Sequence, residues 1–151
     1  MVIRKNIETK YALISVFDKK KLKYLCSNLS LHNYSFISTG STGKRIRKLG
    51  FKCIDLSKVT KIKEMFDGRI KTLNHLVYSS LLYNKENETH KKQFIKLNIP
   101  EIDIIIVNLY PFEKHQKKYK NKDLLEMIDI GGPSLLRAAS KNYKHKTAIM
   151  T

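Results

Sequence analysis

Long apolar runs are missing from this sequence, and their absence excludes one class of protein. No stretch of the 151 residues approaches the roughly 20 consecutive apolar residues that a membrane-spanning helix needs. Residues 1–6 (MVIRKN) also lack the apolar stretch and the small-residue cleavage site of a secretory signal. We therefore expect a cytoplasmic protein that has no membrane partner.

Cysteine and histidine are too few and too scattered to predict a disulfide framework or a metal centre. The two cysteines, Cys26 and Cys53, form no C-x-x-C pair, which predicts reduced, buried thiols. The five histidines lie at positions 32, 75, 90, 115 and 145, and no two of them have the spacing of metal ligands. We therefore expect no dedicated metal site.

Acidic residues are scarce beside the basic ones. The chain has 13 Asp and Glu against 30 Lys and Arg, which gives a formal net charge of +17. Such a surplus attracts phosphate-bearing molecules, nucleic acid among them. However, few of these cations are Arg, the side chain that suits bidentate contacts to bases and phosphates. Lys, Ile and Asn are the residues that A/T-rich codons specify, so codon bias would give the same charge without a selected partner. We favour this explanation over the alternative of a nucleic-acid binder and expect no specific nucleic-acid partner.

Short apolar runs alternate with helical patterns along the chain, which is long enough for one domain. Strands are predicted at 11–16, 34–37, 51–54, 102–107 and 147–150. Helices are predicted at 22–29, 76–82, 90–97, 124–128 and 134–142, and a further short helix is predicted to carry Ile46 and Leu49 and to end at Gly50. Residues 38–43 and 57–74 are predicted to be irregular, and 114–122 to be a solvated basic stretch. The alternation predicts an α/β fold, with a doubly wound and mostly parallel sheet flanked by helices.

Polar segments that contain glycine follow the predicted strands, at 38–43, 108–112 and 129–133. In open α/β sheets ligands bind beyond the carboxyl ends of the strands, so we expect the site there. The segment 38–44 offers backbone N–H groups, hydroxyls and a following helix N-terminus, which suit a phosphate monoester. It is not a Walker loop, because Ser38 stands where the first glycine is needed and Arg45 follows Lys44. A plain strand-to-helix turn explains this segment equally well.

Two further segments contain side chains that could join this site. Arg69, Lys71 and Thr72 place two cations and a hydroxyl within four residues, although a basic surface loop has the same composition. Asp129 and Lys141 lie on either side of the helix predicted at 134–142. A helix of about nine residues spans only roughly 14 Å, so a curled-back loop would bring the two together. The alternative is that Lys141 is an ordinary surface lysine.

Five segments, taken in order, resemble a known family. They read ALISVFDK (12–19), STGST (38–42), DGRIKTL (67–73), VNLYPF (107–112) and IDIGGPSLLRAASKN (128–142). This order is similar to that of the N-terminal IMP cyclohydrolase domain, of methylglyoxal-synthase-like (Rossmann-like) fold, in bifunctional AICAR formyltransferase/IMP cyclohydrolases of purine biosynthesis. The resemblance implies that residues 1–151 are this domain, truncated at its C-terminus, without the formyltransferase domain.

The resemblance also implies a reaction and the residues that perform it. In IMP cyclohydrolase the carboxamide nitrogen of 5-formamidoimidazole-4-carboxamide ribotide attacks the formyl carbon, and loss of water gives IMP without a cofactor. Lys71 and Tyr110 would polarise the formyl oxygen, while Asp129 and Lys141 would handle the protons. The substrate and its phosphate would be bound by Ser15, Lys19, Thr39, Gly40, Ser41, Thr42, Arg69, Thr72, Asn108, Ile130 and Gly131. The implied partners are this small-molecule nucleotide and a second copy of the chain, in the family's usual homodimer.

The sequence departs from the family pattern at several site positions. Ser41 stands where the family usually has glycine, and we expect its side chain to crowd the phosphate or to require strained φ/ψ angles. Phe17 and Lys20 replace small hydroxyl residues. Asn74-His75 replaces the usual His-Pro, which removes a rigid turn.

Other functions fit the same fold. Methylglyoxal-synthase-like domains also serve as regulatory modules for phosphate ligands in a carbamoyl-phosphate synthetase, so a non-catalytic phosphate-binding module or an inactive remnant is the main alternative. Methylglyoxal synthase itself is disfavoured, because its paired Asp and His around a Gly-Asp segment are not found in the sequence.

Overall fold

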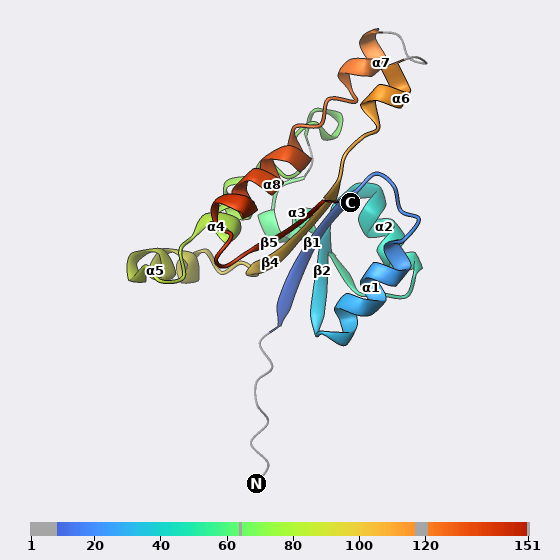
Figure 1. The fold of residues 1–151 in the computed structure, drawn as a ribbon. Helices are drawn as coiled ribbons and strands as arrows, with labels where there is room; N and C mark the ends of the chain where they lie inside the picture. Colours follow the sequence, from blue (N-terminus) through green and yellow to red (C-terminus); the bar gives the residue numbers. More distant parts are fainter. Residues whose placement is uncertain (1–8, 64, 117–120, 151) are drawn as a thin grey trace.

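A five-stranded parallel sheet forms the centre of the fold (Figure 1). The structure is a computed structural model that describes residues 9–63, 65–116 and 121–150. The strands are β1 (Lys10–Val16), β2 (Tyr34–Ser38), β3 (Cys53–Asp55), β4 (Ile102–Asn108) and β5 (Thr147–Met150). They lie in the order β3-β2-β1-β4-β5, and every neighbouring pair is parallel. The predicted α/β class is therefore confirmed.

Strand β1 is the central strand and is buried on both faces. Leu13 pairs in register with Ile37 of β2 on one side and with Ile105 of β4 on the other. All three side chains are inaccessible to solvent. The uninterrupted apolar run that predicted this strand is typical of a parallel sheet covered on both sides.

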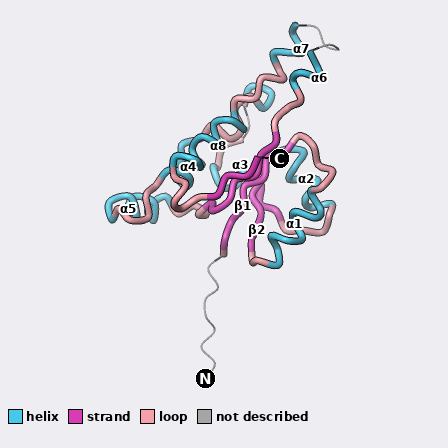
Figure 2. The backbone as a smooth tube through the Cα atoms, in the orientation of Figure 1, coloured by secondary structure: helices cyan, strands magenta, loops and turns pink. Residues whose placement is uncertain are grey.

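Helices cover both faces of the sheet, as Figure 2 shows. The helices are α1 (Leu22–Leu31), α2 (Gly40–Lys48), α3 (Leu56–Thr60), α4 (His75–Leu82), α5 (Glu88–Leu97), α6 (Phe112–Gln116), α7 (Asn121–Leu125) and α8 (Gly131–Lys141), with a 3-10 turn at Phe66–Gly68. One apolar core joins the sheet to α3, α4 and α8, and the other joins it to α1 and α2. Successive β1 side chains alternate between them, since Leu13 belongs to the first core and Ala12 and Ile14 to the second. None of the helices in the described ranges is long and apolar enough to cross a membrane.

The two cysteines contribute to the core that contains α1 and α2. Cys26 is buried, Cys53 is half-buried, and neither forms a disulfide. Burial raises the pKa of each thiol to about 11, so both are protonated and poorly nucleophilic at neutral pH. Their reduced state agrees with the prediction from the sequence.

Several element boundaries differ from those predicted. Helix α2 begins at Gly40, inside the segment predicted as a loop, because this glycine adopts a φ of +45° and turns the chain within one residue. Helix α8 begins at Gly131, where a bond from Gly132 N to Asp129 Oδ1 caps it. Helix α3 lies in the segment predicted as irregular, and its Leu56 and Thr60 are buried. The stretch predicted as solvated contains the end of α6 and the start of α7, and its residues 117–120 are outside the described ranges.

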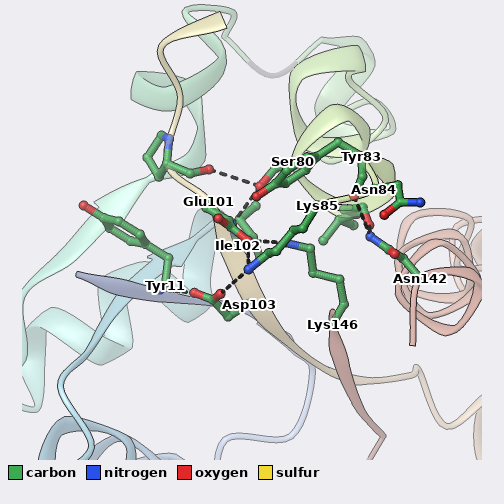
Figure 3. Close-up of polar contacts among 12 residues, drawn as sticks. Tyr11, Ser80, Tyr83, Asn84, Lys85, Glu101, Ile102, Asp103, Asn142 and Lys146 are labelled. Carbon is green, nitrogen blue, oxygen red and sulfur yellow. Dashed lines mark hydrogen bonds and ion pairs between the residues drawn. The ribbon is translucent and has the colours of Figure 1, made fainter. Parts of the chain in front are cut away.

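A polar cluster holds the amino end of β4, opposite the end where ligands are expected (Figure 3). The buried Lys146 ammonium lies 2.9 Å from Glu101 Oε1, and Lys85 pairs with the same carboxylate. Asp103 accepts a hydrogen bond of 3.0 Å from Tyr11 N at the start of β1. Burial lowers the pKa of Lys146, although Glu101 opposes this shift. These bonds tie together the amino ends of β1, β4 and β5.

Candidate functional site

A cavity of about 540 Å³ opens at the carboxyl ends of β1 and β4. From β1 the chain continues to β2 on one side of this strand, whereas β4 lies on its other side. The strand order therefore reverses between β1 and β4. Ligands of open α/β sheets bind at such a switch point, and the volume suits a small molecule. The lining residues are Ser15, Val16, Phe17, Lys19, Thr39, Gly40, Ser41, Thr42, Gly68, Arg69, Lys71, Thr72, Asn108, Tyr110, Leu125, Glu126, Ile128, Asp129, Ile130, Gly131 and Gly132. Every predicted site residue except Lys141 is among them.

Asn108 fixes the loop that follows β1. Its Oδ1 accepts hydrogen bonds from Phe17 N at 2.5 Å and Asp18 N at 3.2 Å, and its Nδ2 donates to Asp18 O at 3.0 Å. Lys19 Nζ donates to Phe17 O at 2.9 Å, which adds a second tie within the loop. Asn108 was predicted to position the substrate ring, whereas its amide is engaged with this loop. It acts on the site through the loop that it holds.

The predicted phosphate loop is the first turn of α2. Thr39 is the N-cap residue in an extended conformation, and no side chain caps the helix. Among the residues that the structure describes, no side-chain capping bond to the first N–H groups of α2 is found, which is the arrangement that helix N-termini offer to anions. The expected strain at Ser41 is absent, because Gly40, and not Ser41, takes the positive φ. Ser41 is exposed at the cavity.

The Thr42 hydroxyl is engaged with the end of β1. It donates to Val16 O at 2.9 Å and accepts from Val16 N at 3.4 Å. The side chain is buried and ties α2 to the end of β1. Sequence spacing placed Thr42 in the loop correctly, but it could not tell that the hydroxyl turns toward β1.

Lys71 lies between the first turn of α2 and the start of α8. Its Nζ is 3.8 Å from the position that a Cβ atom would have at Gly40. The neighbouring Thr72 is buried, and a Cβ atom at Gly131 would come within 2.5 Å of Thr72 Oγ1. Glycine at 131 therefore permits the close approach that places the Lys71 segment beside α8. This brings a cation to the same end of the cavity as the α2 N-terminus.

Asp129 lies at the amino end of α8. Its Oδ1 accepts a hydrogen bond of 2.9 Å from Gly132 N, and the helix dipole favours a carboxylate at this position. Pro133 occupies the first turn, as predicted. A Cβ atom at Gly132 would lie 2.6 Å from Asp129 Oδ2 and 2.9 Å from Val107 Cγ1. Glycine at 132 is therefore required for the carboxylate to pack against the end of β4.

Tyr110 follows β4 and stands at the rim of the cavity. Its ring is 38% exposed and meets the Phe17 ring edge to face, with centroids 5.2 Å apart. Phe17 was noted in the sequence only as a departure from the family pattern, so its contact with a candidate catalytic residue is a finding of the structure. The two rings form an aromatic wall beside Asn108.

Arg69 and Glu126 form an ion pair at the cavity. Glu126 follows α7 and is separated from Arg69 by 57 positions in the chain. Arg69 was predicted to lie beside the substrate, and it lines the cavity with this carboxylate as its partner. Glu126 itself was missed, because nothing in the local sequence marks it.

Lys141 is the predicted residue that the structure does not bring to the cavity. It ends α8, whose first residue is Gly131 at the cavity, and its side chain is exposed. Eleven helical residues extend about 16 Å, so Lys141 and Asp129 lie at opposite ends of the helix. Within one chain they do not form the predicted proton-handling pair.

The cavity has two chemically different regions. Backbone N–H groups, the Thr39 and Ser41 hydroxyls and Lys71 gather at the α2 side, where they suit a phosphate. Tyr110 and Asp129 offer a phenol and a carboxylate at the side of β4 and α8. In the part of the chain that the structure describes, no group of three or more His, Cys, Asp or Glu could hold a metal ion. The arrangement can bind a phosphorylated small molecule and exchange protons with it.

Comparison with known proteins gives a consistent match. The model of the MGS-like domain family matches residues 21–134. Proteins named "Bifunctional purine biosynthesis protein PurH" are 44% identical over 142 residues in Magnetococcus marinus and 45% identical over 142 residues in Lactobacillus acidophilus. Each match covers 93% of this chain but only 27% and 28% of the relative, so the chain spans about a quarter of the length of these proteins.

A solved structure titled "Crystal structure of ForH" shares the fold. It superposes with a TM-score of 0.81 at 25% sequence identity, and the match covers 93% of this chain and 72% of that chain. The predicted methylglyoxal-synthase-like architecture is thus found in both the sequence and the structural comparison.

Proposed function

Since this chain belongs to the family of MGS-like domains, we propose that it is an IMP cyclohydrolase of purine biosynthesis. The supporting observation is the cavity at the β1/β4 switch point, which collects Lys71, Tyr110 and Asp129 opposite the bare first turn of α2. The relatives named PurH support the same pathway. The proposed reaction converts 5-formamidoimidazole-4-carboxamide ribotide into IMP and water.

Binding is proposed to begin with the phosphate. The dianion would accept hydrogen bonds from the N–H groups of residues 40–42 and from the Thr39 and Ser41 hydroxyls. Lys71 and Lys19 would add positive charge at the same end of the cavity. The imidazole ring would then lie toward Tyr110 and the Ile130–Gly131 backbone, with Arg69 and Thr72 beside it.

Ring closure requires an oxygen to be polarised and two protons to be moved. Tyr110 and Lys71 would donate hydrogen bonds to the formyl oxygen while the carboxamide nitrogen attacks the formyl carbon. Asp129 would accept the proton that this nitrogen loses. Lys71 would give a proton to the formyl oxygen, which completes the carbinolamine. The hydroxyl would then leave as water with the proton held by Asp129, while the former formamide nitrogen returns a proton to Lys71 as the C=N bond forms. This step is a redox-neutral dehydration, so we propose that it uses no cofactor.

We also propose a cellular location and an oligomeric state for the chain. Purine biosynthesis supports a cytoplasmic location for the chain. Exposed apolar side chains near the cavity, among them Met65, Phe66, Leu125 and Ile128, support a homodimer. Equilibrium sedimentation would show twice the mass of the chain if this dimer forms, and the mass of one chain if it does not.

A direct assay tests the function. The purified chain is mixed with the formylated ribotide, and IMP is followed by its absorbance and by chromatography. Lys71→Gln, Tyr110→Phe and Asp129→Asn are each expected to lower the rate by about 10² to 10³-fold. Lys23→Gln, an exposed change on α1, is the matched control and should keep the parental rate. Absence of IMP above the uncatalysed rate in the parent chain would refute the proposal.

The role of Lys141 stays a prediction that the same assay decides. Lys141→Ala should lower the rate if this lysine takes part in proton transfer, and Lys144→Ala, an exposed neighbour, is the control. A rate within a few-fold of the parent would show that Lys141 has no such role.

A non-catalytic phosphate-binding module is the second candidate function. The position of Lys141 outside the cavity favours it, because one of the implied catalytic residues is then missing from the site of a single chain. Isothermal titration with IMP separates the two functions. Tight IMP binding without ring closure would support the module, whereas binding together with turnover would support the enzyme.

A further inference from the structure

Phe17 is held rigidly at the rim of the cavity by its backbone. Its N–H donates to Asn108 Oδ1 at 2.5 Å, and its carbonyl accepts from Lys19 Nζ at 2.9 Å. Asn108 is the last residue of β4, two residues before Tyr110. Because the same asparagine ends β4 and holds the β1 loop, the backbones of residues 17 and 110 are fixed relative to each other.

The Phe17 ring contacts the Tyr110 ring in a favourable geometry. The centroids are 5.2 Å apart and the planes are inclined by 66°, which is the edge-to-face arrangement that aromatic pairs prefer. Within residues 9–63, 65–116 and 121–150, no other ring contact or side-chain hydrogen bond of Tyr110 is found. Among the described residues, the contact with Phe17 is therefore a specific ring contact that restricts the orientation of the phenol.

We infer that Phe17 is a positioning residue that orients the Tyr110 hydroxyl toward the reacting oxygen. The inference rests on the proposed cyclohydrolase function and adds to it a residue that the family pattern does not supply, since small hydroxyl residues are usual there. An exposed tyrosine ring without a neighbour samples several rotamers. Holding one of them before the substrate binds removes an entropic cost from the chemical step.

Kinetic variants test this inference. Phe17→Ala and Phe17→Leu should each lower kcat about tenfold while KM stays within about twofold, because the contact acts on the chemical step and not on the phosphate. Phe17→Tyr keeps the aromatic ring and should restore kcat to within about twofold of the parent. Phe17 is 43% exposed, so none of these changes empties the core. Tyr24→Leu, which alters a 73% exposed ring on α1, is the control and should not change kcat.

A double-mutant cycle shows whether Phe17 acts through Tyr110. In the Tyr110→Phe background the hydroxyl is absent, so Phe17→Ala should cause no further loss of kcat. The same tenfold loss in both backgrounds would overturn the inference, and so would a change in KM alone. An unchanged kcat in Phe17→Ala would also overturn it.

A spectroscopic measurement separates this inference from the proposed function. With ¹³C,¹⁵N-labelled tyrosine, the three-bond couplings about χ1 of Tyr110, whose signals are assigned by their loss in Tyr110→Phe, should average over several rotamers in Phe17→Leu and stay unchanged in Tyr24→Leu. An inactive parent chain would refute the proposed function, and the NMR comparison would still decide whether Phe17 orients Tyr110. Tyr110 couplings that are unchanged in Phe17→Leu would overturn the inference even if the parent is active.

Discussion

Replacing Gly132 by alanine tests the turn that holds Asp129 at the cavity. The new Cβ atom would lie 2.6 Å from Asp129 Oδ2, 2.9 Å from Val107 Cγ1 and 3.0 Å from Leu109 Cδ2. Val107 is buried in the core and has no free space to move into. The Asp129 carboxylate is therefore the group expected to shift, and its bond from Gly132 N would weaken.

Two effects of opposite sign set the magnitude of this change. Alanine is favoured over glycine by up to about 1 kcal/mol in a helix interior, and by less in the first turn. Overpacking costs about 1–3 kcal/mol, and a weakened hydrogen bond adds about 0.5–1.5 kcal/mol. The steric effect is the larger, so we expect the free energy of unfolding to fall by about 1–3 kcal/mol. Displacement of the carboxylate should also lower the ring-closure rate by about tenfold or more.

Urea denaturation followed by circular dichroism gives the free energy, and the IMP assay gives the rate. Ser140→Ala changes another small residue, exposed on the same helix, and should stay within about 0.5 kcal/mol of the parent. A Gly132→Ala protein that is as stable and as active as the parent would refute the argument that close packing around this glycine positions Asp129.

The polar cluster at the amino end of β4 and the ion pair at the cavity give three further expectations. Lys146→Met keeps the volume of a buried side chain but removes one partner of Glu101, so denaturation in urea should show a loss of about 1–3 kcal/mol; no loss would mean that the pair does not stabilise the fold. Burial raises the pKa of Glu101, but the bonds from Lys85, Tyr83 and Lys146 outweigh it and keep this pKa below the ordinary 4.5. The Glu101 carboxylate therefore stabilises the fold fully above the ordinary pKa of 4.5, and this stabilisation is lost as the pH falls through the folded pKa. Glu101→Gln should therefore reduce the dependence of the free energy of unfolding on pH between about pH 3 and pH 5. An unchanged slope would contradict this. Arg69→Gln removes an exposed ion pair with Glu126 and should leave the melting temperature nearly unchanged while raising KM for the ribotide; a large fall in the melting temperature would show instead that the pair is structural.

The sequence predicted the sheet well because apolar runs determine strands that are buried on both faces. The apolar runs at 11–16 and 102–107 form β1 and β4 for this reason. The ends of the helices were predicted less well, because Gly40 and Gly131 start α2 and α8 through backbone conformations and close contacts that depend on neighbouring segments. A propensity pattern contains no information about such contacts.

The composition of the site was predicted, but the orientation of its side chains was not. Segments far apart in the chain line one cavity, as the family resemblance implied. Thr42 and Asn108 turned out to hold the β1 end and the β1 loop, because their bonding partners are backbone atoms that only the folded chain brings near. Lys141 was placed with Asp129 on the assumption of a curled loop, whereas the intervening residues form helix α8, which keeps the two apart.

The most direct test of the central claim is a crystal structure of the chain with IMP bound. The account predicts that the phosphate lies on the first N–H groups of α2, with Thr39 and Lys71 beside it. It also predicts that the purine ring lies within hydrogen-bonding distance of Tyr110 and Asp129. A nucleotide bound elsewhere on the molecule, or bound with its phosphate away from residues 39–42, would contradict the account.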